Sequence, residues 1–215
     1  CKTIRANRSW PLIEDDIHNV SSEQIRKLGR FGRKSPDLLI GGPPCQPFSK
    51  SAYWSTGDSK RLDDPRADTL TAYLRVLRDL KPKVFLLENV QGMTFKGKDE
   101  GLRLLENIIA KINDETESKY TFEWRVLNAA NFGVPQMRAR VYLVGSRKGK
   151  IFKFPEPTHV DPTLVGRDLF SKKPWKNAWD AIGDLEGLVD VKSPEMQIGG
   201  KWGRLLASIP EGKNY

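Results

Sequence analysis

Two short apolar runs constrain the fold of this chain more than any other feature. Residues 37–40 and 83–87 are each almost wholly apolar and are too short for a buried helix, so both are predicted to be buried strands. Between them, residues 70–77 place apolar side chains at i, i+3, i+4 and i+7, which is the spacing of one helix face. A strand, a helix and a strand in this order predict an α/β fold, with an open, mostly parallel sheet and flanking helices.

The first run leads into a stiff loop that carries a cysteine. The sequence Gly-Gly-Pro-Pro-Cys-Gln-Pro-Phe-Ser occupies residues 41–49, so Cys45 comes just past the carboxyl end of the strand, where open α/β sheets hold their ligands. The prolines fix backbone torsions and remove amide donors. A buried, inert thiol is the commoner role of a lone cysteine, but it needs no flanking prolines. The neighbours favour a nucleophile.

The second run ends in Glu88-Asn89-Val90. A carboxyl group directly after a buried strand is costly unless it is paired or protonated. Hydrogen bonds from loop amides would satisfy Glu88 without any function, whereas a protonated carboxyl could pass its proton to a ring nitrogen. Because both strands end at the same edge of the sheet, Glu88 and Cys45 are predicted to face one crevice.

Residues 136–142 alternate with a period of two. Gln136, Arg138 and Arg140 share one predicted face of a strand, and the smaller apolar residues share the other. An ordinary half-exposed strand gives the same pattern. Two arginines beside a glutamine also suit the recognition of carbonyl or phosphate oxygens, since a guanidinium presents a fixed fork of donors.

The N-terminal part offers weaker signals. Residues 1–7 read like the middle of a helix, and residues 11–13 predict a short strand that ends at an acidic turn. A carboxylate at that strand end could accept hydrogen bonds from a nucleoside, although Asp16 could equally begin a turn. Ser21 and Gln24 fit a capping box. The basic run at residues 26–34 is more often a solvated surface than a binding patch.

Composition limits the partners. The formal charge of +9 and pI of about 9.5 favour a polyanionic partner, because neutralising phosphates releases counterions. Two cysteines and two histidines predict neither a disulfide framework nor a metal cluster, and they favour a reducing compartment. No apolar run approaches the roughly 18 residues that span a bilayer. We therefore expect an intracellular protein with no metal and no membrane partner.

The loop at residues 43–49 resembles the catalytic loop of the C5-cytosine DNA methyltransferases. Four further elements match that family in the same order: Asp16-Ile17, a leucine after an Asp-x-Arg element, Glu88-Asn89-Val90, and Gln-x-Arg-x-Arg after a Gly-x-Pro turn. Together they cover about two-thirds of the chain. The resemblance implies a Rossmann-like S-adenosylmethionine-dependent methyltransferase fold.

The resemblance also implies roles for single residues. It implies catalytic roles for Cys45, Glu88 and Arg140, and also for Arg138, which matches the structural neighbour of Arg140 in the family motif. It implies cofactor-binding roles for Asp16, Ile17, Pro44 and Leu70. The implied reaction transfers a methyl group from S-adenosylmethionine to C5 of a cytosine flipped out of double-stranded DNA, through a covalent bond between Cys45 and C6. Restriction-modification is the implied setting, in the prokaryotic cytoplasm or nucleoid, or in a nucleus if the source is eukaryotic.

Two departures from the family pattern affect these expectations. The Phe-x-Gly-x-Gly loop that grips the cofactor, the acidic residue after it, and the late family elements are absent. We therefore expect an incomplete fold from an internal piece of a longer enzyme, with weak cofactor binding or none by this chain alone. The remainder could be a separate segment or chain. Residues 1–154 are predicted to be the catalytic domain, and residues 155–215 the linker and the start of the target-recognition domain.

Two other functions fit the same residues. One branch of the family modifies tRNA cytosines at C5, and a side-by-side assay on DNA and tRNA would separate the two substrates. A catalytically silent nucleic-acid-binding subunit that needs a second chain is the other alternative.

Overall fold

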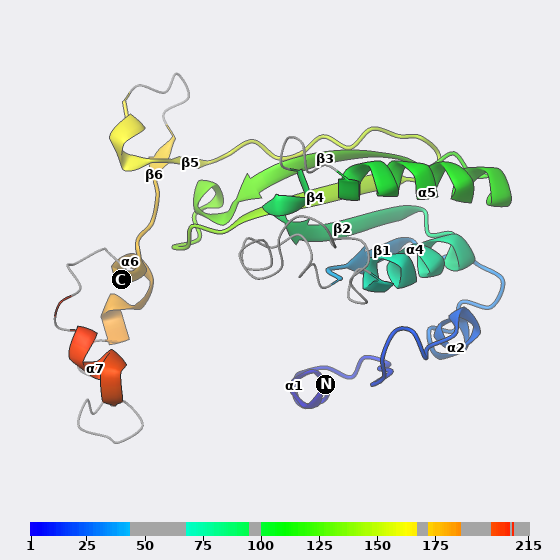
Figure 1. Ribbon diagram of the computed structural model, residues 1–215, viewed down its shortest axis with the longest axis horizontal. Coiled ribbons are helices and arrows are strands. Elements are labelled where there is room, and N and C mark those ends of the chain that lie inside the picture. The colour runs from blue at the N-terminus through cyan, green and yellow to red at the C-terminus, as the bar shows by residue number, and fades with distance from the viewer. Residues whose placement is uncertain (44–67, 95–99, 167–171, 186–198, 207, 209–215) are drawn as a thin grey trace.

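A four-stranded sheet lies at the centre of the computed structural model, which describes residues 1–43, 68–94, 100–166, 172–185, 199–206 and 208 (Figure 1). The strand order is β1-β2-β4-β3. The strands are β1 (Leu38–Gly41), β2 (Val84–Val90), β3 (Thr121–Asn128) and β4 (Ala139–Ser146). β1 and β2 run parallel, while β4 runs antiparallel to both of its neighbours. The α/β fold is confirmed, and the parallel pair comes from the two apolar runs. The burial predicted for the first run is wrong, because Leu38 and Ile40 of β1 are 49% and 64% exposed at the end of the described sheet.

Two helices, α4 (Asp68–Leu80) and α5 (Glu100–Thr116), lie along one face of the sheet (Figure 1). The helix faces expected from the spacing are confirmed, because Leu70, Leu74 and Leu77 of α4 are at most 5% exposed. They join one core cluster with inward side chains of α5, β2 and β4, among them Leu105 and Leu143. Burial of this apolar surface is the main favourable contribution to folding.

Tyr73 connects α4 to the sheet. Its hydroxyl donates a hydrogen bond to the carbonyl oxygen of Leu86 at 3.1 Å, and burial raises the pKa of the phenol. The ring occupies the space beside Gly41, where an added Cβ would lie 2.5 Å from the ring carbons. β1 can therefore end against α4 only because residue 41 has no side chain.

The N-terminal part packs against α4 through polar contacts. α1 (Lys2–Asn7) is followed by α2 (Ser22–Leu28), which begins with the predicted capping box between Ser21 and Gln24. The Ser22 hydroxyl donates to Asp79 Oδ2 of α4 at 2.7 Å. The strand predicted at residues 11–13 is wrong, since these residues adopt no strand and β1 is the last strand on that side of the described sheet.

The chain beyond β4 runs back along the sheet and then leaves it (Figure 1). Short elements follow: β5 (His159–Val160), β6 (Lys173–Pro174), α6 (Ala178–Ile182) and α7 (Gly200–Leu206). The indole N–H of Trp175 donates to Asn131 Oδ1 at 2.9 Å, which ties this part to the turn between β3 and β4. None of the helices in the described ranges is both long and apolar enough to cross a bilayer.

Replacing Gly145 by alanine is expected to destabilise the sheet by about 3 kcal/mol or more, since overpacking a dense core typically costs 1–3 kcal/mol. A Cβ at Gly145 of β4 would lie 2.1 Å from the ring of Phe85, which is 1% exposed. Urea unfolding measures the loss. Gly199→Ala is the matched control, because a Cβ there meets no atom within 4 Å.

A second variant, Gly145→Ala with Phe85→Leu, is expected to recover part of the lost free energy of unfolding, because it removes the ring that clashes. Equal stability of Gly145→Ala and Gly199→Ala would contradict the packing described here.

Candidate active site

Two of the predicted catalytic side chains form an ion pair on the sheet. Arg140 Nε lies 3.2 Å from Glu88 Oε1, and the two side chains are 23% and 32% exposed, respectively. The guanidinium also donates through Nη1 to the carbonyl oxygen of Ala139 at 2.8 Å. A partly buried pair of this kind is screened by salt less than a surface pair.

Strand register explains why these two residues meet. β2 and β4 pair antiparallel, with Val90 opposite Arg140 and Glu88 opposite Tyr142. Glu88 and Arg140 are therefore diagonal neighbours, which side chains of this length can bridge. Alternate residues of β2, such as Phe85 and Leu87, belong to the core cluster. Because the side-chain period is two, Glu88 points away from the helices α4 and α5.

The loop that carries Cys45 begins beside this ion pair. Gly42 directly follows β1, and a Cβ added to it would lie 3.3 Å from Glu88 Oε2. Cys45 is three residues further along the chain. The two glycines after the first apolar run predict a close approach of another group to the backbone, and the carboxylate of Glu88 is that group at Gly42. Pro44 and Cys45 lie outside the described residues, as does the Asp-x-Arg element that precedes Leu70.

Arg138 does not share a strand with Arg140, so the alternation predicted from residue 136 is wrong in its first part. β4 begins only at Ala139. The amide of Arg138 donates to Asn128 Oδ1 at 3.0 Å, and its side chain is exposed. The cause is the preceding turn, in which Gly133 has a φ of 85° and the amide of Gln136 donates to the carbonyl of residue 134 at 2.8 Å.

Asp16 and Ile17 form a tight turn against α4. Asp16 Oδ1 accepts hydrogen bonds from the backbone amide of His18 at 2.9 Å and from its ring Nδ1 at 2.6 Å. The backbone hydrogen bond, followed by the ring contact, holds the pKa of Asp16 below its ordinary value. The carbonyl of Ile17 accepts from Arg75 Nη2 of α4 at 2.8 Å. The carboxylate therefore stays ionised at a fixed position.

A largely apolar hollow of about 410 Å³ opens beside this turn. Its lining includes Ile13, Ile17, Val20, Leu28 and Phe31. An ionised carboxylate next to an apolar hollow suits a ligand with one polar edge and one flat apolar face, such as a nucleoside. Leu70, by contrast, is 5% exposed and belongs to the core cluster. No group of metal-ligating side chains occurs among the described residues.

Comparison with known proteins decides the family. The family model for the C-5 cytosine-specific DNA methylases matches residues 1–197. The chain belongs to this family. Type II methyltransferase M.AquIA of Picosynechococcus is 43% identical to it over 195 residues, which cover 86% of this chain and 75% of that protein. Type II methyltransferase M.SacI of Streptomyces achromogenes is 39% identical over 201 residues.

The coverage of the relatives differs. The match to M.SacI takes in 93% of this C-5 methylase chain and only 49% of M.SacI, so the chain spans about half the length of that relative. Among solved structures, Entamoeba histolytica methyltransferase EhMeth is 21% identical, with a TM-score of 0.46 over 67% of this chain and 42% of that one.

Proposed function

We propose that this chain is the catalytic part of a DNA (cytosine-5)-methyltransferase of the restriction-modification type. The observation that carries the proposal is the partly buried pair between Glu88 and Arg140, next to Gly42 at the start of the Cys45 loop. A carboxyl group, a guanidinium and the base of a cysteine loop meet at one edge of the sheet. Family membership supports the same reaction.

Each of these groups answers one chemical need of the reaction. C5 of cytosine is too poor a nucleophile to take a methyl group directly. Attack of the Cys45 thiolate on C6 turns the ring into an enamine, which makes C5 nucleophilic. When the cytosine displaces it from Arg140, Glu88 takes up a proton from solvent; its carboxyl group then hydrogen-bonds N3 and the exocyclic amine and gives N3 that proton as charge develops there. Arg140 holds O2 and stabilises negative charge on it.

The remaining steps restore the cysteine. S-adenosylmethionine, when bound, supplies the methyl group. After methylation the C5 proton passes to water, its bonding electrons re-form the C5–C6 double bond, and the bond between C6 and sulfur breaks to release Cys45 as a thiolate, while N3 returns its proton to Glu88. These atoms are out of reach in a base-paired duplex, so the cytosine must be flipped into the pocket.

The cofactor contacts follow the geometry of the Asp16 turn. We infer that Ile17, which lines the apolar hollow, and Asp16, its neighbour in the chain, hold the nucleoside end of S-adenosylmethionine. Asp16 uses Oδ1 for both of its contacts with His18, which leaves Oδ2 to accept from a ligand. Pro44 is proposed to line the same site from the cysteine loop. Leu70 is proposed only as the packing support of α4 beneath it.

A duplex with 5-fluorocytosine at the target position tests the proposal. Fluorine at C5 cannot leave as a cation, so the enzyme stays bonded to the base once methylation has occurred. With S-adenosylmethionine present, we expect a denaturation-stable complex, and peptide mass spectrometry should place the bond on Cys45. A parallel reaction with tRNA separates the two cytosine substrates. Release of unmodified protein from every substrate would refute the proposal.

A further inference from the structure

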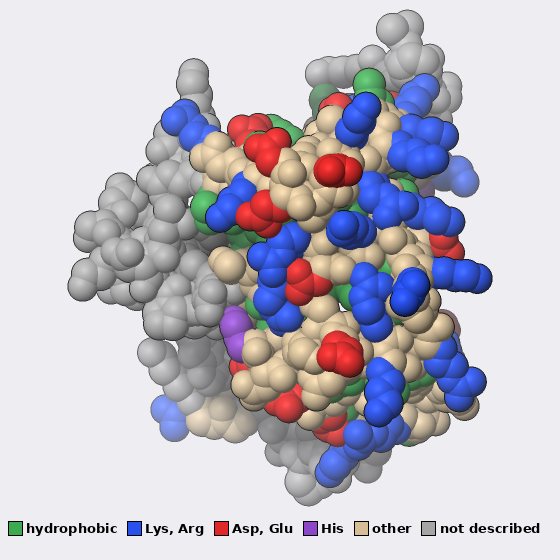
Figure 2. Space-filling model, turned by 90° about the vertical axis from the view of Figure 1, so that its right-hand side faces the viewer, with side chains coloured by type: hydrophobic (Ala, Val, Ile, Leu, Met, Phe, Trp, Pro, Cys, Tyr) green, Lys and Arg blue, Asp and Glu red, His purple; other side chains and the backbone are tan. Residues whose placement is uncertain are grey.

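A strongly basic face lies at the end of the sheet opposite Glu88 and Arg140. Figure 2 shows Lys and Arg side chains gathered over this end of the molecule. We call the basic face the set of exposed cationic residues that four chain segments bring here: Arg33, Lys34, Lys83, Lys119, Lys148 and Lys150. Glu88 is five residues after Lys83 on β2, so the face lies roughly 17 Å from the proposed active site along the strand.

Backbone contacts hold these segments together. The amide of Lys119, just before β3, donates to the carbonyl of Arg147 at 3.1 Å. The amide of Lys83 donates to the carbonyl of Pro36 at 3.0 Å. The guanidinium of Arg147 donates through Nη1 to Ser35 Oγ at 2.8 Å and to the carbonyl of Lys81 at 2.6 Å. The basic run before β1 is thus fixed beside the lysines at the end of β4.

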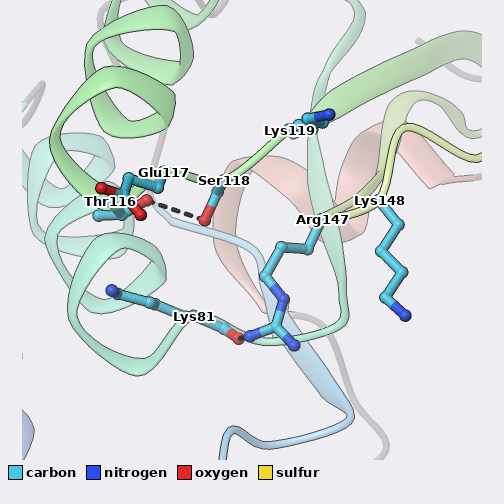
Figure 3. A pocket seen from close by; sticks show the side chains of 7 residues that line it. All are labelled: Lys81, Thr116, Glu117, Ser118, Lys119, Arg147 and Lys148. Atoms are coloured by element: carbon cyan, nitrogen blue, oxygen red, sulfur yellow. Dashed lines mark hydrogen bonds between the residues drawn. The ribbon is translucent and has the colours of Figure 1, made fainter.

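A hollow of about 360 Å³ opens within this face (Figure 3). Residues 116–119 line one side of it, and Lys81, Arg147 and Lys148 line the other. The guanidinium of Arg147 already donates hydrogen bonds to Ser35 and to the carbonyl of Lys81, so it is not free to bind one small anion through two parallel hydrogen bonds. The remaining ammonium groups sit around the hollow on flexible stems, which suits several separate phosphates.

Carboxylates also lie at this end of the molecule, among the basic side chains (Figure 2). Lys83 is paired with Asp37 at 2.6 Å, and Glu117 lines the hollow. Within the described part of the chain, the side chains of Lys119, Lys148 and Lys150 take part in no ion pair. These three lysines, two of which are joined by the β-bridge between Lys119 and Lys148, raise the local potential and attract a polyanion.

We propose that the basic face is a second contact for duplex DNA, which binds the phosphate backbone without reading sequence. The inference rests on the proposed function only for the choice of DNA as the polyanion. Phosphate contacts of this kind supply affinity and let a protein remain on DNA between specific sites. Because the face lies away from Glu88, it would hold a flanking part of the duplex or a second segment, and not the flipped base.

The salt dependence of binding tests the proposal. Fluorescence anisotropy with a labelled 30-base-pair duplex gives the dissociation constant over a range of salt concentrations. Lys119→Gln/Lys148→Gln/Lys150→Gln is expected to make the slope of log K against log salt shallower by about 2 to 3, since each phosphate contact contributes about 0.9. At about 0.1 M salt the affinity should fall at least tenfold. The matched control, Lys119→Arg/Lys148→Arg/Lys150→Arg, keeps the charges and should keep the slope.

The outcomes separate this inference from the function. Both triple variants should still form the Cys45 adduct with 5-fluorocytosine DNA at saturating DNA, because none of the three lysines belongs to the proposed active site. An unchanged slope in the Gln variant overturns the second contact even if the adduct forms. A shallower slope without any adduct supports the contact and counts against the methyltransferase. Loss of binding to anionic lipid vesicles, with duplex binding intact, would also overturn it.

Discussion

Replacing Cys45 by serine is expected to lower the rate of methyl transfer by about 10⁴-fold or more, because removal of a covalent nucleophile is among the costliest changes to an enzyme. A serine hydroxyl remains protonated near neutral pH, whereas a thiol readily gives the thiolate that attacks C6. Transfer of a tritiated methyl group to duplex DNA measures turnover, and the 5-fluorocytosine complex should disappear as well.

The chain provides a matched control for this change. Cys1 is a free, exposed cysteine, and Cys1→Ser makes the same exchange of sulfur for oxygen. This variant should retain the activity and the adduct of the parent enzyme. Equal turnover in the two serine variants would remove Cys45 from the mechanism.

Replacing Glu88 by glutamine is expected to lower kcat by about 10²- to 10⁴-fold, the usual contribution of a positioned general acid or base. Glutamine keeps the length of the side chain and can still hydrogen-bond the ring, but it has no proton to give to N3. Its amide also leaves the guanidinium of Arg140, now 3.2 Å from the carboxylate, without a charged partner. Single-turnover methylation at saturating DNA isolates this loss from any change in binding.

Glu123→Gln is the control for Glu88→Gln. Glu123 lies on β3 of the same sheet and is exposed, so the same loss of one carboxylate should leave kcat within about twofold. A fall in kcat for Glu88→Gln together with a large fall in Tm would show that the pair acts through stability. A fall in kcat with Tm unchanged would show that Glu88 acts in the chemistry. Unchanged kcat would exclude it from the proton transfer.

Local patterns predicted most of the sheet and its helices. Residues 84–87 of the second apolar run form the first part of β2, which extends three residues further, to Val90. The spacing from Leu70 to Leu77 identified the buried face of α4. These predictions succeed because the buried face of a strand or helix repeats every two or 3.6 residues, and this spacing of apolar residues can be read from the segment alone.

The errors occurred where local pattern competes with chain geometry. Residues 136–138 alternate like a strand, yet the left-handed Gly133 keeps them in a turn, so Arg138 is separated from the face of Arg140. The apolar residues 11–13 form no strand; the described sheet ends at β1 and gives them no neighbour. A segment forms a strand only beside a partner strand, and its own sequence does not show whether a distant part of the chain provides one.

The candidate site was predicted only as a set of residues. The sequence placed Glu88 at the end of one strand and Arg140 on a face of another, but it could not show that they touch, because their contact depends on the register between β2 and β4. The sequence pattern at residues 26–34 favours a solvated basic surface. It does not indicate that Arg147 hydrogen-bonds Ser35 and so holds this run beside the lysines that follow β4.

The antiparallel register of β4 makes the site intolerant of insertions along one particular stretch of chain. One residue added between Leu143 and Gly145, with Gly145 still opposite Phe85, would turn the guanidinium of Arg140 to the helix-covered side and Leu143 to the opposite face of the sheet. An insertion at Gly149 or Lys150, after the strand has ended, would leave the pairing with β2 as it is. Inserted residues and peptide tags should therefore be tolerated at Gly149 and Lys150, after β4 has ended, and should disrupt the sheet when placed inside β4.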